Sequence, residues 1–289
     1  MNAATGGERA DGGRPGTADA GRLVAPDRQW QPDLYLRYAA YRERPAHDLL
    51  AQVPDLPEDL AGGLVVDLGC GPGNVTPHLA ARFPLARLLG VDNAPAMLAR
   101  ARQLDLAATW QEADVATWTP PEPAALIFSN AVLQWLQDHH RLLPRLAGCL
   151  APGGILAVQM PAYLRATSLT LVHDVAQDGP WAAALEGRLR VNPVAEAAVY
   201  YDLLAPACDT LDLWETVYQH VMDGPDDIVT WSQGTALLPV REALDAGGYA
   251  AFVEAYRAAV HRAYPRQPDG RVLFPFRRLF LLGRRRSGG

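Results

Sequence analysis

The sequence contains no lysine, so all 26 of its lysine-plus-arginine residues are arginine. Without lysine, the chain has neither the amine for Schiff-base catalysis nor the lysine of a phosphate-binding loop. Cysteine is scarce as well: Cys70, Cys149 and Cys208 lie far apart, with no Cys-x-x-Cys pair. This scatter argues against a disulfide framework and a zinc site, so no metal is expected, and it is typical of a reduced compartment.

Long apolar runs and an excess of positive charge are also missing. No apolar segment approaches the ~20 residues that a membrane span requires. The net charge of −6 disfavours a nucleic-acid binder, which needs a basic surface. Residues 1–29 are rich in Gly, Ala, Asp and Arg without the apolar core of a secretion signal, and they are predicted to be a disordered extension. The sequence therefore predicts a cytoplasmic protein whose partner is a small molecule.

The folded part alternates short apolar runs with helical spacing. Residues 64–68, 87–91, 107–111, 124–129 and 154–160 are typical of buried parallel strands. Helices are expected over 74–83, 95–103 and 139–150, preceded by a lid-like helix over 32–53 that is interrupted near Pro45. Strands and helices in this order predict an α/β fold with a Rossmann-like, doubly wound sheet.

The pattern changes after Pro161. Residues 167–207 are predicted to be helical, 210–222 and 272–282 to be strands, and 226–233 and 248–264 to be helices. The two late strands complete a seven-stranded, mostly parallel sheet, and the helices form a cap. We therefore divide the chain into the extension 1–29, a ligand-binding core with its lid helix over 30–161, and a substrate region over 162–289 that holds the cap and the last two strands.

A glycine-rich turn follows the first strand, where residues 67–73 read Asp-Leu-Gly-Cys-Gly-Pro-Gly. Glycines there let the backbone approach a ligand closely. A dinucleotide-binding turn would need glycine where the chain has Asn74. In addition, the Asp67 carboxylate would repel a pyrophosphate and attract the ammonium and sulfonium groups of S-adenosylmethionine. The turn therefore favours S-adenosylmethionine, held around Gly69 and Gly71, over a nicotinamide dinucleotide.

Acidic residues also follow the next two strands. Asp92 ends the second strand, where a carboxylate accepts both ribose hydroxyls of a nucleoside, and Asn93 and Met97 follow it. Asp114 and Val115 follow the third strand, within reach of an adenine. Either aspartate alone would be read equally well as a helix cap or a turn residue. Because ligands bind at the carboxyl ends of parallel strands, the two together favour a nucleoside site.

Several segments resemble the trans-aconitate 2-methyltransferase family. Residues 129–135 read Ser-Asn-Ala-Val-Leu-Gln-Trp, 30–35 read Trp-Gln-Pro-Asp-Leu-Tyr, 42–45 read Arg-Glu-Arg-Pro, and 157–161 read Ala-Val-Gln-Met-Pro. The resemblance covers residues 30 to about 285. It implies transfer of a methyl group from S-adenosylmethionine to a carboxylate of trans-aconitate. A carboxylate is already ionised at neutral pH, so no catalytic base is expected. His139 and His140 are interpreted as capping or solvent-facing residues.

The predicted site residues fall into two sets. The expected donor-binding residues are Tyr35, Arg44, Asp67, Gly69, Gly71, Asp92, Asn93, Met97, Asp114, Val115 and Asn130. The expected acceptor-binding residues are Gln134, Trp135, Trp214, Tyr218 and Arg278. Arg278 is chosen because a guanidinium binds a carboxylate through two hydrogen bonds. Trp135, Trp214 and Tyr218 are open to a second interpretation, as plain core.

The chain departs from the family in the predicted cap. Leu238 stands where the family has an arginine, which would remove a contact if that arginine meets an acceptor carboxylate. Three alternatives therefore remain: another small carboxylic acid as acceptor, an enzyme that consumes S-adenosylmethionine itself by elimination or cyclisation, and a non-catalytic binding protein. A damaged glycine turn or a missing ribose acid would mark the binding protein, and the sequence has neither.

Overall fold

The computed structural model describes residues 39–162, 166–189 and 193–287. Within them, seven strands form one sheet in the order β3-β2-β1-β4-β5-β7-β6. β1 to β5 run parallel, and β7 lies antiparallel to both β5 and β6. The strands are β1 (Leu64–Leu68), β2 (Arg87–Asp92), β3 (Ala108–Glu112), β4 (Ala124–Asn130), β5 (Leu150–Pro161), β6 (Cys208–Met222) and β7 (Val272–Arg285). The predicted doubly wound sheet and its late pair of strands are confirmed.

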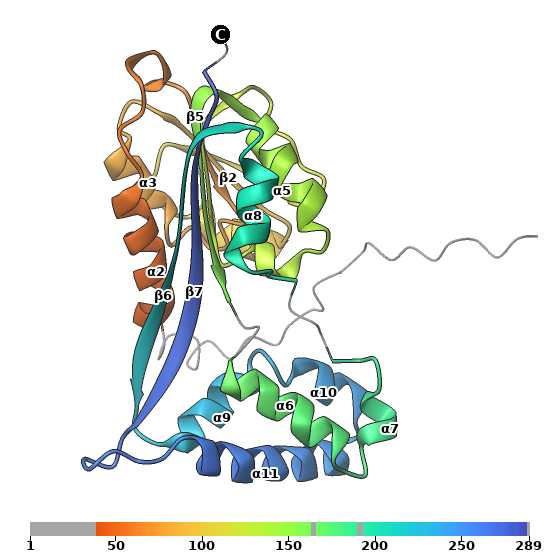
Figure 1. Cartoon of the computed structure of the whole chain (residues 1–289). Coiled ribbons are helices and arrows are strands. Elements are labelled where there is room, and N and C mark those ends of the chain that lie inside the picture. The colour runs from red at the N-terminus through yellow and green to blue at the C-terminus, as the bar shows by residue number, and fades with distance from the viewer. Residues whose placement is uncertain (1–38, 163–165, 190–192, 288–289) are drawn as a thin grey trace, which may run out of the picture.

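Helices cover both faces of this sheet (Figure 1). One face carries α2 (Ala39–Gln52) and α3 (Thr76–Arg82), and the other carries α5 (His139–Gly148) and α8 (Ala197–Leu204). α4 (Pro95–Ala101) packs beside β2 and β3. Short turns of 3-10 helix, η1 (Glu58–Leu60) and η2 (Leu133–Trp135), precede β1 and follow β4.

The sheet is held by two apolar layers. Val65, Leu126 and Phe128 pack against Leu49 of α2, whereas Val66 and Leu156 pack on the α5 side. These side chains are almost fully buried, and each such burial contributes about 1.5–3 kcal/mol. α2 continues through Pro45, so the predicted interruption there is wrong, because packing of the helix on the sheet outweighs the lost hydrogen bond. The predicted extension 1–29 and residues 30–38 of the lid lie outside the described residues.

The cap is a separate apolar cluster below the sheet (Figure 1). It comprises α6 (Thr167–Gln177), α7 (Ala182–Leu185), α9 (Pro225–Gln233), α10 (Leu238–Ala243) and α11 (Ala246–Ala263). β6 and β7 are long enough to join both parts: Phe280 packs beneath α2, while Phe274 and Met222 belong to the cap cluster. No helix in the described ranges is long and apolar enough to cross a membrane.

Candidate active site at the carboxyl ends of β1, β2 and β4

The sheet reverses its order of connection next to β1. The chain proceeds from β1 outward to β2 and β3, and then returns to β4 on the opposite side of β1. Their carboxyl ends therefore leave a crevice between β1 and β4, which is the usual ligand site of such sheets. The turn after β1, Asp92 of β2 and Asn130 of β4 all lie at this edge.

The turn after β1 is shaped by three glycines with positive φ, Gly69 (80°), Gly71 (55°) and Gly73 (84°). The amides of Gly69 and Cys70 donate to the carbonyl of Val91, at 2.7 and 3.0 Å. A Cβ at Gly69 would lie 2.2 Å from a methyl carbon of Val132, so this glycine is required by packing. At Gly71 a Cβ would meet nothing within 4 Å. The turn therefore presents open space at Gly71, where a ligand can approach the backbone.

Asp67 is buried beneath this turn. The hydroxyl of Thr76 donates to its Oδ2 at 2.6 Å. Burial raises the pKa of Asp67 to about 6, and the nearby charge of Asp92 adds to the rise. The two neighbouring carboxyl groups form an acidic pole, which is stabilised by a cationic ligand. The site thus fits the ammonium and sulfonium of S-adenosylmethionine and opposes a pyrophosphate.

Asp92 is tied to the turn rather than projecting freely. Its Oδ2 accepts from the amide of Gly71 and its Oδ1 from the amide of Ala94, both at 2.8 Å. Each carboxylate oxygen can accept a further hydrogen bond. Asn93 is exposed and Met97 half-buried at the start of α4. After β3, exposed Asp114 accepts from the amide of Ala116, and Val115 is buried in the core.

The segment after β4 carries an unusual backbone. Ala131 has a φ of 56° and its amide donates to the carbonyl of Gln159. A left-handed alanine is strained, and such residues cluster at functional sites. Oδ1 of Asn130 is buried and has no hydrogen-bond partner in the described part of the chain. The side-chain Nε2 of Gln134 donates to the carbonyl of Ala131, at 2.6 Å.

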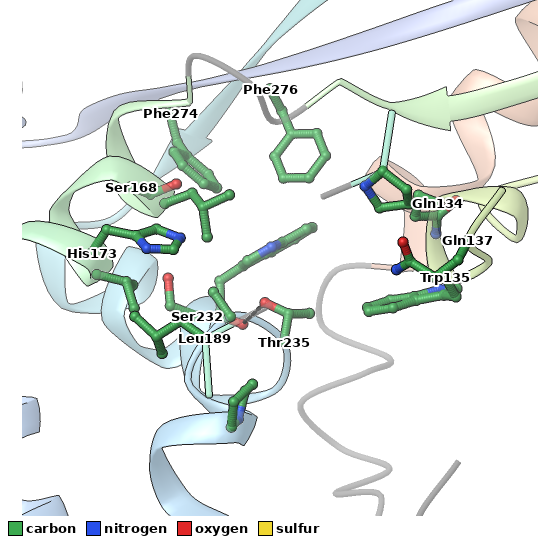
Figure 2. A pocket seen from close by; sticks show the side chains of 16 residues that line it. Gln134, Trp135, Gln137, Ser168, His173, Leu189, Ser232, Thr235, Phe274 and Phe276 are labelled. Carbon is green, nitrogen blue, oxygen red and sulfur yellow. Dashed lines mark hydrogen bonds between the residues drawn. The ribbon is translucent and has the colours of Figure 1, made fainter. Parts of the chain in front are cut away.

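A cavity of about 190 Å³ opens between η2 and the cap (Figure 2). Gln134, Trp135 and Gln137 line it from the sheet side, and Figure 2 shows them facing cap residues across the space. Its cap wall includes Ser168, His173, Leu189, Ser232 and Thr235, and Phe274 and Phe276 of β7 close one side. Leu238, the departure from the family pattern, is buried and is not among the described lining residues.

Arg278 lies beside this cavity, with its guanidinium carbon 4.5 Å from the ring centre of Phe276. It is only 3% exposed. Arg44 of α2 lies 5.2 Å from the ring centre of Tyr218, whose hydroxyl donates to Asp48 at 2.7 Å. Burial lowers the pKa of His220 to about 4, and the charges of Arg278 and Arg44 lower it further. Both arginines therefore lie near His220. Because Arg44 pairs with Asp48 at 3.8 Å, Arg278 supplies the buried positive charge of this region.

The predicted residues are thus distributed over three places. The glycine turn, Asp67 and Asp92 come together, with Asn130 at the end of the adjacent strand. Gln134 and Trp135 reach the cavity, whereas Arg44 and Tyr218 lie together between α2 and β6. Trp214 stacks on Phe280 at 4.7 Å beneath α2, within the sheet's core. Tyr35 lies outside the described residues.

His139 is neither a cap nor a solvent-facing residue, so that interpretation was wrong. Its ring is 4% exposed, with Nδ1 2.6 Å from the Tyr200 hydroxyl and Nε2 2.9 Å from the Leu133 carbonyl. Asp138, with a φ of 58°, turns the start of α5 so that this ring faces α8. Burial lowers the pKa of His139, which keeps it neutral and structural.

Sequence reasoning missed Gln159 in β5. Its side chain is fully buried, and neither amide atom has a hydrogen-bond partner in the described chain. A signal was present, because Gln159 is the single polar residue of the apolar run 155–160. No group of residues that could ligate a metal ion occurs in the described ranges.

The chain resembles known proteins over most of its length. A family profile described as a methyltransferase domain matches residues 65–154. The trans-aconitate 2-methyltransferase of Azoarcus sp. strain BH72 is 49% identical over 253 residues, which is 88% of this chain and 98% of its own. That of Streptomyces coelicolor is 45% identical over 273 residues, covering 90% and 88% respectively. The solved structure of Bacillus subtilis YcgJ, 13% identical, has a TM-score of 0.54 and covers 85% of this chain and 100% of its own, which shows the fold alone.

The strand order, the open glycine turn and the matching profile define a methyltransferase of the S-adenosylmethionine-dependent class with a Rossmann-like fold. Within that class, the chain belongs to the trans-aconitate 2-methyltransferase family.

Proposed function

We propose that this chain transfers the methyl group of S-adenosylmethionine to one carboxylate of trans-aconitate. The observation that carries the proposal is the separation of charge along the site. Asp67 and Asp92 make the donor side acidic, and the buried guanidinium of Arg278 makes the opposite side basic. A cationic donor and a polyanionic acceptor fit these two poles in one orientation. Relatives named for this reaction match 88–90% of the chain.

On the donor side, the bound S-adenosylmethionine supplies an electrophilic methyl group on a positively charged sulfur. Asp67 attracts the ammonium end, and Gly71 leaves room for it. The second lone pairs of the Asp92 oxygens accept the ribose hydroxyls, with Asn93 and Met97 beside the sugar. Asp114 and Val115 border the adenine, and Asn130 lies nearest the transferred group. Tyr35 and Arg44 complete this set from the lid.

On the acceptor side, Arg278 holds a carboxylate that is not methylated. Gln134 and Trp135 border the entrance, and the cavity beneath the cap accommodates the carbon skeleton. Tyr218 and Trp214 complete this set from β6, where the Trp214 ring stacks on Phe280. Because the acceptor carboxylate is already an anion, the chain needs only to hold the two reactants aligned and exclude water. No side chain of the described site is assigned as a base.

The experiment that tests this proposal is mass spectrometry of purified protein with S-adenosylmethionine, with and without trans-aconitate and other small carboxylic acids. The expected result is S-adenosylhomocysteine and a product heavier by one methylene, both dependent on trans-aconitate. If only a different acid is methylated, that acid is the acceptor in place of trans-aconitate. Methylthioadenosine formed without any acceptor would show that S-adenosylmethionine is itself consumed, and no turnover beside tight donor binding would contradict an enzyme.

A further inference from the structure

The amide of Gln159 is the most fully buried polar group in this part of the sheet. The residue is 0% exposed, and neither Oε1 nor Nε2 forms a hydrogen bond within the described chain. Buried polar groups are almost always paired, because an unpaired one has lost its water without compensation. An amide left unpaired on a rigid strand is therefore a candidate for pairing with a ligand.

The sheet register places Gln159 between the two poles of the site. Gln159 pairs with Asn130 of β4 on one side and with Phe280 of β7 on the other. Because side chains alternate between faces, Arg278 lies on the same face as Phe280, diagonal to Gln159. Such diagonal neighbours are within reach of long side chains. Asn130, Gln159 and Arg278 thus form a polar row across three adjacent strands.

The surroundings of this row are apolar. Ala157 of β5 and Phe128 of β4 lie two residues before Gln159 and Asn130, on the same face, in the cluster that packs under α2. Met160 and Val158 point to the opposite face, in the cluster beneath α5 and α8. An amide in such surroundings is shielded from water, where a hydrogen bond to a charged ligand is strong. The fold holds Gln159 rigidly by pairing on both edges of β5.

We propose that Gln159 binds the carboxylate that is methylated, while Arg278 holds another carboxylate of the same acceptor; this rests on the function proposed above. The Nε2 group donates to one oxygen of the reacting carboxylate. The other oxygen uses a lone pair to form the bond to the methyl carbon. The carbon–sulfur bond breaks with its electron pair remaining on sulfur, so the sulfonium becomes a neutral thioether and no proton moves.

A neutral amide suits the reacting carboxylate better than a second guanidinium. An ion pair would stabilise the anionic ground state, in which the charge is full, more than the transition state, in which the charge is being lost. A neutral donor orients the oxygen with a weaker preference for the anion. The chain accordingly has its buried arginine at the far end of the row and the amide next to Asn130.

The decisive variant is Gln159→Met, which keeps the length of the side chain and removes both hydrogen-bonding atoms. Its melting temperature is expected to equal or exceed that of the parent, because an unpaired amide is no longer buried. The acceptor kcat/KM is expected to fall about 10- to 100-fold, and the donor Kd to change less than about twofold. Gln159→Glu should lose more activity at pH 8 and recover part of it at lower pH, where protonation removes the repulsion between carboxylates.

Met160→Leu is the matched control, because Met160 is the next residue of β5 and faces the other side of the sheet. It should keep kcat/KM. Parental kcat/KM in Gln159→Met would overturn the proposal. A lower melting temperature together with a weaker donor Kd would overturn it as well, because those changes mark a structural role. If the parent protein methylates none of the acids, the proposed function fails. If the parent is active and the Gln159 variants keep its acceptor kcat/KM, only this inference fails.

Discussion

The amide of Gly71 donates to Oδ2 of Asp92 across 2.8 Å, which joins the turn after β1 to the end of β2. The proposed ribose acid therefore also fixes the turn that approaches the donor. Asp92→Ala is expected to raise the donor Kd about 100-fold, since hydrogen bonds to a charged group are worth about 1.5–3 kcal/mol each. Asp92→Asn keeps one acceptor oxygen and should lose less. Isothermal calorimetry measures both, and an unchanged Kd in Asp92→Ala would remove Asp92 from the ribose site.

Gly71 and Gly270 share a positive φ and empty space around the missing Cβ, but only Gly71 borders the crevice. Gly71→Val is expected to abolish donor binding by filling that space. Gly270→Val carries a similar backbone strain, about 1–2 kcal/mol, and should bind the donor normally. Melting temperatures of the two variants should fall together. Normal donor binding by Gly71→Val would mean that the turn is purely structural.

Donor binding is expected to depend on pH through Asp67. Its pKa is about 6 in the folded, ligand-free chain. Below about pH 6, a proton must therefore leave Asp67 before the cationic donor binds. The donor Kd should therefore rise as pH falls below 6, by up to about tenfold per pH unit. Calorimetry from pH 5 to 8 tests this, and Asp67→Asn should bind weakly without that dependence. A parent protein with a flat profile would contradict the assignment.

The same raised pKa has an opposite consequence for stability. The folded state holds the Asp67 proton more tightly than the unfolded chain does, so the contribution to stability is full below pH 3.8 and is lost as pH rises through about 6. Asp67→Asn is expected to raise the melting temperature of the ligand-free protein at pH 8, because the variant lacks the buried charge that the parent carries there. Thermal denaturation checks this, and a lower melting temperature would show that the carboxylate stabilises the fold.

Arg278 and Arg277 offer a matched comparison on one strand. Arg278 is buried beside Phe276, whereas Arg277 faces outward and pairs with Glu215 at 3.2 Å. Arg278→Leu is expected to raise the acceptor KM about 10- to 100-fold, from a charge-assisted pair worth about 1.5–3 kcal/mol, and to leave the donor Kd nearly unchanged. Arg277→Leu should leave both unchanged. A loss of donor affinity in Arg278→Leu would move this arginine to the other half of the site.

Acid should destabilise the protein partly through His220. Its pKa is about 4 in the folded chain, so the unfolded chain, which protonates near 6.5, takes up the proton first as pH falls. Stability is therefore lost between pH 6.5 and 4, by about 3 kcal/mol when complete. Urea unfolding at pH 5 and 8 should show a smaller difference in His220→Leu than in the parent. An equal difference would assign the acid sensitivity to other groups.

Features with a strong local signal were predictable from the sequence. β1 and its turn are a short apolar run followed by closely spaced glycines, and the sequence placed β1 at Leu64–Leu68, where it lies. α10 (Leu238–Ala243) was missed, because a helix of six residues is too short to show a repeat. His139 and Gln159 depend on long-range contacts: the first meets Tyr200 on another helix, and the second is enclosed by strands distant in sequence. Neither environment can be seen from neighbouring residues.

The unbroken pairing of β6 with β7, from Thr210 opposite Arg284 to Met222 opposite Val272, has a mechanical consequence. One half of this ribbon is paired with β5 in the sheet, and the other half carries Met222, Phe274 and Phe276 of the cap cluster. Because β5 pairs with β7 only from Arg284 to Arg278, a reorientation of the cap relative to the sheet falls on residues 272–277, where β7 is paired with β6. Arg278 thus stands at the last position where three strands are hydrogen-bonded side by side, and the cap is carried entirely on the two-stranded part beyond it.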